Sequence, residues 1–482
     1  MHKKHLETLN MTLQIPFDNT YARLPSNFYS KLTAEVVSAP SMIAYNFPLA
    51  KELGITGEND QDIIEIFSGN KVALGSDPLA QLYAGHQFGQ YNPQLGDGRA
   101  LLLGETIKAD GVRYDIQLKG SGPTPYSRSG DGRAWLGPVL REYLVSEAMH
   151  ALGIPTTRAL AVILSGEPVM RENLLPGAIL TRVASSHIRI GTFQVFSARR
   201  DWTSLKILLE YAINRHFPSA DGPLGFLHEV IKAQAALIPK WMGVGFIHGV
   251  MNTDNCQIAG ETIDYGPCAF MDRFHPMRVY SSIDRMGRYA YGSQPDIIVW
   301  NLAQLATALV PLMPDKDKAI EAFTNAINDM PRIVKKNWLK VFAKKIGISS
   351  IQLGDEDLIT KLLNLMADGH ADFTNTFSTL GSSSTRDQFM EPKKFDIWEK
   401  EWQIRISTEK DPIIHMKQAN PVLIPRNHRI EEMISAALKE DYVPFERLQR
   451  ALSSPFAQNA AFSDLRRPPL ETEEIKATFC GT

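Results

Sequence analysis

The chain has 482 residues, 44% of them hydrophobic, which is enough to bury a large core and to form two or three domains or lobes. Its net charge of -2 at pH 7 gives no basic footprint, so neither nucleic acid nor a membrane is expected as a partner. The basic start at residues 1–10 is not followed by an apolar signal segment, and three scattered cysteines suit neither a disulfide framework nor a zinc site. We therefore expect a globular, cytoplasmic protein.

The first half of the chain is predicted to be an α+β unit with a mainly antiparallel sheet. A mixed, partly helical stretch at residues 27–53 precedes a segment rich in Gln and Gly that ends at Ala100. Two apolar runs between Ala100 and Lys119 suit a hairpin, and a loop with four glycines then leads to a helix that ends near Leu152. Two more strands are expected at residues 159–164 and 178–183.

The second half is predicted to be helical, and the boundary between the two halves falls near residues 192–204. Residues 255–266 suggest a small hairpin that would bring Asn255 and Asp264 to the same end of two paired strands. The apolar stretch at residues 297–313 is interrupted by polar side chains, so it is predicted to be a buried helix and not a membrane span. Helices continue to about residue 450, and the tail beyond is irregular.

The segment HGVMNTDN, His248 to Asn255, is followed nine residues later by DYG and has the outline of a kinase catalytic loop. Asn255 and Asp264 offer the oxygen ligands that Mg²⁺ or Mn²⁺ prefers beside phosphate. Val250 stands where a kinase has its catalytic Asp, which leaves Asp254 as the nearest carboxylate for a proton acceptor. Taken alone, NTDN could also be a simple Asn/Asp turn.

Lys119 ends a predicted strand and Glu142 follows 23 residues later on the next helix, which matches the lysine–glutamate ion pair that orients phosphates in kinases. Each residue alone would more often be solvated. Residues 125–200 contain nine arginines, no lysine and five acids, a bias that suits a polyphosphate. Arg182 and Arg189 are the expected clamps, although surface arginines remain the simpler alternative.

Two further residues have a simpler interpretation beside the chemical one. His248 could act as a base, but a His at this place in a kinase loop is usually a structural hydrogen-bonding residue. Cys480, third from the end, could be a redox-sensitive thiol or have no role.

Several long segments together resemble the selenoprotein O family of kinase-fold proteins, whose members act as protein adenylyltransferases. The segments are FDNTYARLP, YAGHQFGQYNPQLGDGRA, LKGSGPTPYSRSGDGRAWL, GFIHGVMNTDN, IDYGP and NPVLIPRNHRI, followed by a cysteine near the end. The resemblance implies a two-lobed kinase-like fold with a mainly antiparallel N-lobe sheet, a helical C-lobe and a helical C-terminal extension. The corresponding ranges would be 1–95 (N-terminal extension), 96–200 (N-lobe), 201–320 (C-lobe) and 321–482 (C-terminal extension).

The resemblance also implies an activity: transfer of AMP from an inverted ATP to Ser, Thr or Tyr hydroxyls of proteins, with a divalent metal. By the same resemblance Asp254 is the proton acceptor, Asn255 and Asp264 are metal ligands, and Glu142 is the helix glutamate. The nucleotide contacts fall on Gly96, Gly98, Arg99, Lys119, Asp131, Gly132, Arg182, Arg189 and Asp264.

One feature of the family is missing from this chain. Some members link the C-terminal cysteine to a second cysteine just after the DYG segment, but HPMRVYSSID contains none here. Cys268 could substitute only if the tail reaches it.

Three alternatives stay open at the level of sequence. The nucleotide could be UTP, since nothing in the chain identifies the residues that contact the base. The chain could be a conventional kinase that transfers the γ-phosphoryl group, which Val250 opposes, or a non-catalytic nucleotide-binding scaffold.

Overall fold

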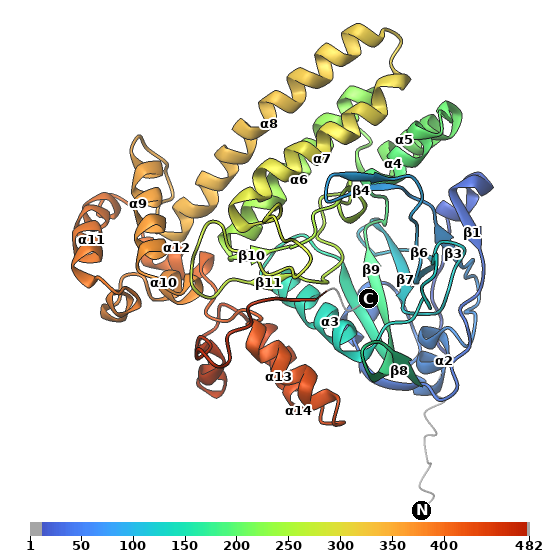
Figure 1. Cartoon of the computed structure of the whole chain (residues 1–482), viewed down its shortest axis with the longest axis horizontal. Helices are drawn as coiled ribbons and strands as arrows, with labels where there is room; N and C mark the ends of the chain where they lie inside the picture. The colour runs from blue at the N-terminus through green and yellow to red at the C-terminus, as the bar shows by residue number, and fades with distance from the viewer. Residues whose placement is uncertain (1–11, 480–482) are drawn as a thin grey trace, which may run out of the picture.

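The computed structural model describes residues 12–479 (Figure 1). Its centre is a seven-stranded antiparallel sheet in the order β1-β3-β6-β7-β9-β8-β2. The strands are β1 (Tyr29–Lys31), β2 (Ser41–Tyr45), β3 (Leu79–Gln81), β6 (Ala100–Ile107), β7 (Arg113–Lys119), β8 (Arg158–Met170) and β9 (Leu174–Ala184). The predicted α+β class with an antiparallel sheet is confirmed.

The two faces of the sheet are covered by different helices because the side chains of its strands alternate. Leu101 and Leu103 of β6 belong to a core with α1 (Phe47–Glu52) and α2 (Asp60–Ser68), whereas Leu102 belongs to the larger core that includes α3 (Leu136–Ala151). The helix that the sequence predicted before Leu152 is therefore α3, and it covers the face opposite α1 and α2.

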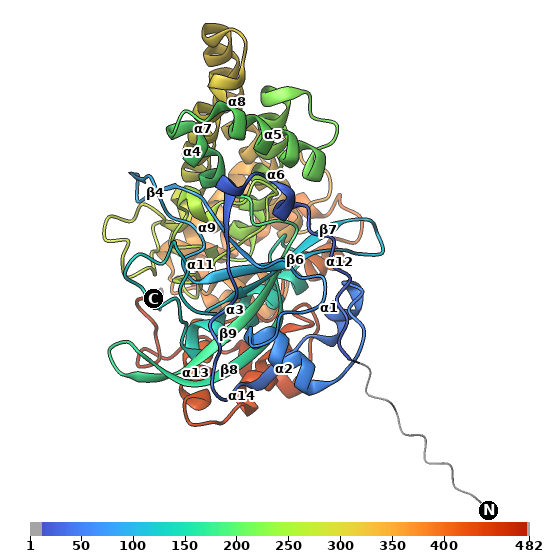
Figure 2. The same cartoon turned by 90° about the vertical axis from the view of Figure 1, so that its right-hand side faces the viewer.

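The helical half is built around three long helices that pack on one another: α6 (Gly222–Gly243), α7 (Gln294–Leu309) and α8 (Lys316–Lys345). It is entered through α4 (Ile190–Ala198) and α5 (Trp202–His216) and continues as α9 (Asp355–Asp368), α10 (Phe373–Thr379), α11 (Pro392–Ile406) and α12 (Pro412–Ala419). The last two helices, α13 (Asn427–Ala437) and α14 (Val443–Leu452), return to pack on α3 (Figures 1 and 2). The C-terminal part thus supports the helix that carries Glu142.

Helix α7, extended by its flanking turns to Tyr291–Leu312, is long and apolar enough to cross a membrane by length and composition alone. One side of it is buried against α4, α6 and α8, which agrees with the predicted buried helix. Its buried Asn301 donates to the carbonyl oxygen of Met251 and to the sulfur of Cys256. The helix therefore supports the loop that contains Asp254.

One local prediction was wrong. Residues 255–266 do not form a hairpin, because Gln257 bridges to Arg189 and Thr262 bridges to Thr156 instead of to each other. The stretch 27–53 is mixed and partly helical as predicted, with the strands β1 and β2 before the short helix α1. The strands β1, β2 and β3 belong to the same sheet as the strands of residues 100–184, so the sheet crosses the predicted division at residue 95. That division and the two kinase-like lobes stay predictions.

Candidate active site

A cavity of about 750 Å³ opens where β6, β7 and β9 meet the loop after β10 (Phe246–Ile247) and the loop before β11 (Ala269–Phe270). Glu142 does not line it but lies behind it, bonded to two residues that do. The other predicted site residues all line it: Gly96, Gly98, Arg99, Lys119, Asp131, Gly132, Arg182, Arg189, Asp254, Asn255 and Asp264.

Lys119 and Arg182 reach the cavity from neighbouring strands. Gln117 lies opposite Arg182 in the β7/β9 ladder, and side chains two residues apart share a face, so Lys119 and Arg182 lie on one face of the sheet. Glu142 of α3 meets both: its Oε2 is 2.6 Å from Lys119 Nζ, and its Oε1 accepts from Arg182 Nε at 2.9 Å. The ion pair that the spacing predicted is present.

Three cations meet at the carboxylate of Asp264. Its Oδ1 lies 3.1 Å from Lys119 Nζ and 2.6 Å from Arg182 Nη2, and its Oδ2 lies 2.9 Å from Arg189 Nη1. Burial alone would raise the pKa of Asp264, but these cations hold it well below its usual value. The backbone of Asp264 also has a φ of 62°, which is unusual for a residue other than glycine. A polyphosphate entering the cavity would compete with Asp264 for the same cations.

Arg189 connects this cluster to the predicted catalytic loop, His248–Asn255. Its guanidinium stacks 4.6 Å from the ring centre of Tyr83 and donates to the backbone oxygen of Asp254 at 2.5 Å. Its Nη2 lies 4.0 Å from Oδ1 of Asp97, whose pKa burial raises to about 6. Tyr83 and Asp97 also line the cavity, but the sequence analysis did not select them.

Asp254 has one engaged and one unengaged carboxylate oxygen. Oδ2 accepts from Gln87 Nε2 at 3.1 Å, whereas Oδ1 is buried without a hydrogen-bond partner in the described chain. The residue is 7% exposed, and burial raises its pKa to about 6. A cavity-lining carboxylate with a raised pKa suits a proton acceptor near neutral pH.

A small hairpin, β4 (Gly85–Gln87) and β5 (Gln90–Asn92), holds the catalytic loop in place. The N–H of His86 donates to Thr253 Oγ1 at 2.7 Å and the N–H of Phe88 donates to Asn252 Oδ1 at 3.0 Å. Gly85 is required here, because a Cβ on it would lie 2.6 Å from Asp254 Oδ1. Gln87, which contacts Asp254 from this hairpin, was missed because its Gln- and Gly-rich segment has no recognisable period.

Asn255 and Asp264 present different oxygens to the same cavity. The side-chain amide of Asn255 donates to the backbone oxygen of Val250 at 3.0 Å, which leaves its Oδ1 as the free end. Within residues 12–479 no group of three or more His, Cys, Asp or Glu side chains could hold a metal ion. One amide oxygen and one carboxylate fit a hard cation that takes its remaining ligands from phosphate and water.

The loops 96–99 and 120–133 pack tightly at the cavity wall. A Cβ on Gly98 would lie 2.9 Å from the backbone oxygen of Tyr126 in the other loop, and one on buried Gly132 would lie 2.1 Å from that of Gly122 in the same loop. Asp131, predicted to contact the nucleotide, forms an ion pair with Arg171, whose Nη1 lies 2.8 Å from its Oδ2. These glycines are thus needed for the packing of the loops, independently of any contact that they make with phosphate.

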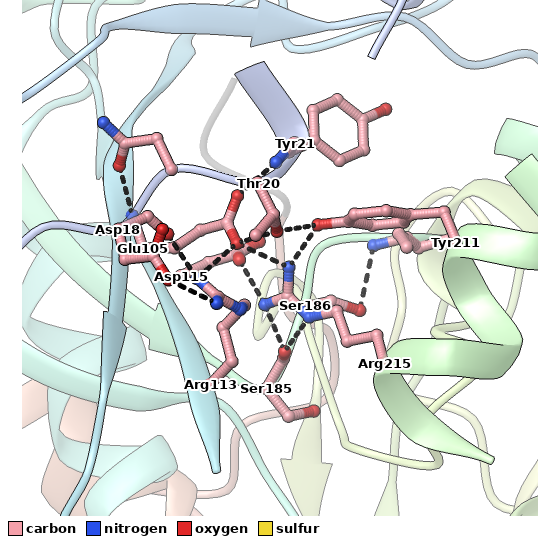
Figure 3. A network of polar contacts seen from close by, with 12 residues as sticks. Asp18, Thr20, Tyr21, Glu105, Arg113, Asp115, Ser185, Ser186, Tyr211 and Arg215 are labelled. Carbon is pink, nitrogen blue, oxygen red and sulfur yellow. Dashed lines mark hydrogen bonds and ion pairs between the residues drawn. The ribbon is translucent and has the colours of Figure 1, made fainter. Parts of the chain in front are cut away.

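A polar network, shown in Figure 3, includes Ser185 and Ser186 of the segment that leads to Arg189. Arg215 of α5 donates to Ser185 O at 2.9 Å and to Asp115 Oδ1 at 2.5 Å, and His187 Nδ1 lies 2.9 Å from Asp115 Oδ2. The network extends to the N-terminal segment through Asp18, Thr20 and Tyr21, to β6 through Glu105, and to β7 through Arg113.

His248 has the structural role expected of it. It is buried, it stacks on Trp241, and its ring nitrogens lie 2.8 Å from the carbonyl oxygen of Ile263 and 3.3 Å from the N–H of Val250. Burial lowers its pKa, so the ring is neutral. Cys268 is also buried, and burial raises its pKa to about 12. Cys480 lies outside the described residues.

Comparison with known proteins supports the resemblance on which the site was assigned. The family model described as protein adenylyltransferase SelO matches residues 11–453. The chain belongs to the SelO family. It is 62% identical over 472 residues to the protein nucleotidyltransferase YdiU of Ruegeria sp. (strain TM1040), covering 98% of this chain and 100% of the relative. It is 50% identical over 491 residues to the protein of the same name from Bradyrhizobium diazoefficiens, with 98% and 100% covered. This SelO-family chain is therefore an enzyme of the nucleotidyltransferase class.

Proposed function

We propose that the chain transfers AMP from ATP to Ser, Thr or Tyr hydroxyls of proteins and releases pyrophosphate. The observation that carries the proposal is that Asp254, whose buried Oδ1 has no hydrogen-bond partner in the described chain, lines the same cavity as Lys119, Arg182 and Arg189. The carboxylate of Asp254 is suited to accept a hydroxyl proton, and the three cations are suited to bind a polyphosphate leaving group. The description of the family model as an adenylyltransferase favours AMP, and the relatives' names favour protein acceptors.

In the proposed reaction the substrate hydroxyl loses its proton to the carboxylate of Asp254 as its oxygen bonds to the α-phosphorus. The bond from that phosphorus to the bridging oxygen breaks, and pyrophosphate leaves with its charge matched by Lys119, Arg182 and Arg189. Glu142 keeps two of these cations in place.

Asn255 and Asp264 would hold Mg²⁺ or Mn²⁺, which would neutralise phosphate charge when bound. We expect chelation by EDTA to abolish transfer and either ion to restore it. An Asp264→Ala variant should not be rescued by any concentration of metal, because it lacks the only charged ligand of the proposed pair. Full transfer in EDTA would contradict this part of the proposal.

Labelled nucleotides test the reaction itself. Label from α-³²P-ATP should appear on protein and label from γ-³²P-ATP should not. Asp254→Asn should lower the rate at least about a hundredfold, the usual contribution of a general base. Protein labelled only from the γ position would instead indicate a conventional kinase, and preferential labelling from α-³²P-UTP would change the transferred group to UMP.

A non-catalytic scaffold predicts a different result. Its partner binding and cellular phenotype would be the same in the Asp254→Ala and Asp264→Ala variants as in the parent.

A further inference from the structure

A turn at residues 281–289, here called the acceptor turn, exposes apolar side chains at the mouth of the cavity. Ile283 lines the cavity and is still 52% exposed, and Met286 is 92% exposed. Arg285, between them, is exposed and forms no ion pair with any residue of the described chain. Exposed apolar side chains that gather in one place often mark a binding surface, because covering them is favourable. This surface lies next to the proposed proton acceptor.

The acceptor turn is held rigidly from inside. Asp284 is buried, and its carboxylate accepts from the N–H of Arg288 at 2.9 Å and from the N–H of Tyr289 at 2.7 Å. Ile283 and Arg285, on either side of buried Asp284, are both exposed. Their exposure thus follows from a fixed turn and not from a loose loop.

The same turn is bonded to the catalytic loop. The hydroxyl of Tyr289 donates to Asn252 Oδ1 at 2.6 Å, and the Tyr289 ring packs 5.1 Å from that of Phe88, which also lines the cavity. Asn252 stands two residues before Asp254. The position of the acceptor turn is therefore coupled to that of the proposed base through two contacts.

The C-terminal segment supports the acceptor turn from the other side. Thr478 pairs with Ser281 in a parallel bridge, and its N–H and carbonyl oxygen bond to Tyr280 O at 2.7 Å and to Ser282 N at 3.0 Å. Its hydroxyl donates to Pro267 O at 2.6 Å, close to the DYG segment. The turn is thus fixed at both ends.

We propose that the acceptor turn is the docking surface for the protein that receives the nucleotide, and that it favours a hydroxyl flanked by an apolar residue and a carboxylate. The inference depends on the proposed function, since it assumes that the hydroxyl must reach Asp254. Ile283 and Met286 would cover the apolar residue, and Arg285 would pair with the carboxylate. A protein segment is the partner with this chemistry that can also carry the hydroxyl.

A positional-scanning peptide library with a central Ser, Thr or Tyr, incubated with α-³²P-ATP, tests the proposal. The parent should prefer Leu, Ile or Met and Glu or Asp at positions near the hydroxyl. Ile283→Ser and Met286→Ser should each lower kcat/KM for the preferred peptides about fivefold to tenfold, in line with the loss of one apolar contact. In Arg285→Glu the preference for Glu in the peptide should be replaced by a preference for Lys.

Controls separate docking from folding and from the chemistry. All variants should bind a fluorescent ATP analogue as the parent does, and Leu353→Ser, at an apolar residue that is fully exposed and absent from the cavity lining, should keep the parental preferences. Identical peptide preferences in the parent and the three variants would overturn the docking surface alone. If the parent labels no peptide from α-³²P-ATP, the proposed function and the docking surface both fall.

Discussion

Asp254 has an environment that favours its neutral form, and this determines how the proposed activity should depend on pH. Burial raises its pKa to about 6, whereas the proposed base must be ionised to accept a proton. The proton-accepting form is therefore dominant above about pH 6 and is lost as the pH falls through that value. We expect kcat/KM, which reports the free enzyme, to decline on the acidic side with a midpoint near pH 6.

Gln87 opposes this effect of burial, and its removal should move the acidic midpoint. Its amide donates to Asp254 Oδ2 and so stabilises the charged carboxylate. In Gln87→Leu the pKa of Asp254 should rise further, shifting the acidic limb to higher pH while affinity for ATP at pH 8 stays close to that of the parent. Gln94→Leu is a matched control, since Gln94 is exposed and does not line the cavity. The same acidic limb in Gln87→Leu and in the parent would show that the hydrogen bond does not tune the base.

At the scale of the element, the β4–β5 hairpin should be as important as the catalytic loop that it contacts. In Gly85→Ala the new methyl group would lie 2.6 Å from Oδ1 and 2.9 Å from Cβ of Asp254, so the base must move. A displacement of this size should lower kcat at least about tenfold without a comparable loss of ATP binding. Gly225→Ala in α6 is the control, because its Cβ would meet neighbours only at ordinary contact distances from 3.4 Å. If Gly85→Ala has the kcat of the parent, the hairpin shifts to accommodate the methyl group without displacing Asp254.

The elements that the sequence predicted correctly are those whose pattern is local. The β6–β7 hairpin and α3 follow from alternating and helical periods, and the Lys119–Glu142 pair follows from their spacing. The predicted hairpin at residues 255–266 failed because its backbone groups find partners in distant segments, Gln257 with Arg189 and Thr262 with Thr156. Periodicity within one segment carries no information about such partners.

The same distinction applies to the candidate site. Asn255, Asp264 and Asp254 were found from a motif, and their meeting in one cavity did not require the hairpin that was predicted to join them. Gln87, Tyr83 and Asp97 were missed because their significance lies in what they touch across the fold.

At the scale of the whole molecule, the buried network of Figure 3 joins three parts of the chain that lie far apart in sequence. The N-terminal segment, the β6–β7 hairpin and α5 all contribute charged side chains to it. Arg215 pairs with Glu105 and Asp115 of the hairpin, and Arg113 pairs with Asp18 of the N-terminal segment. Because Arg215 also binds the carbonyl of Ser185, the network holds the segment that leads to Arg189. Stability and the position of a proposed phosphate-binding arginine should therefore be coupled.

Replacing Arg215 with Met tests this coupling. Arg215 Nη1 lies 3.3 Å from buried Glu105 and its Nη2 lies 2.5 Å from buried Asp115, so the substitution leaves two carboxylates short of a counter-charge. Loss of one partner from such a buried group costs about 3–5 kcal/mol, which urea unfolding would measure. ATP affinity should fall in the same variant because the segment before Arg189 is released.

A second substitution distinguishes the unpaired charge from lost packing. Arg215→Met combined with Asp115→Asn removes one of the stranded carboxylates and should recover part of the stability. Arg332→Met, at an exposed pair with Asp329 on α8, should leave the unfolding midpoint where it is in the parent. If the single and the double variant lose equal stability, the side-chain volume of Arg215 and not its charge is what joins the N-terminal segment, the sheet and α5.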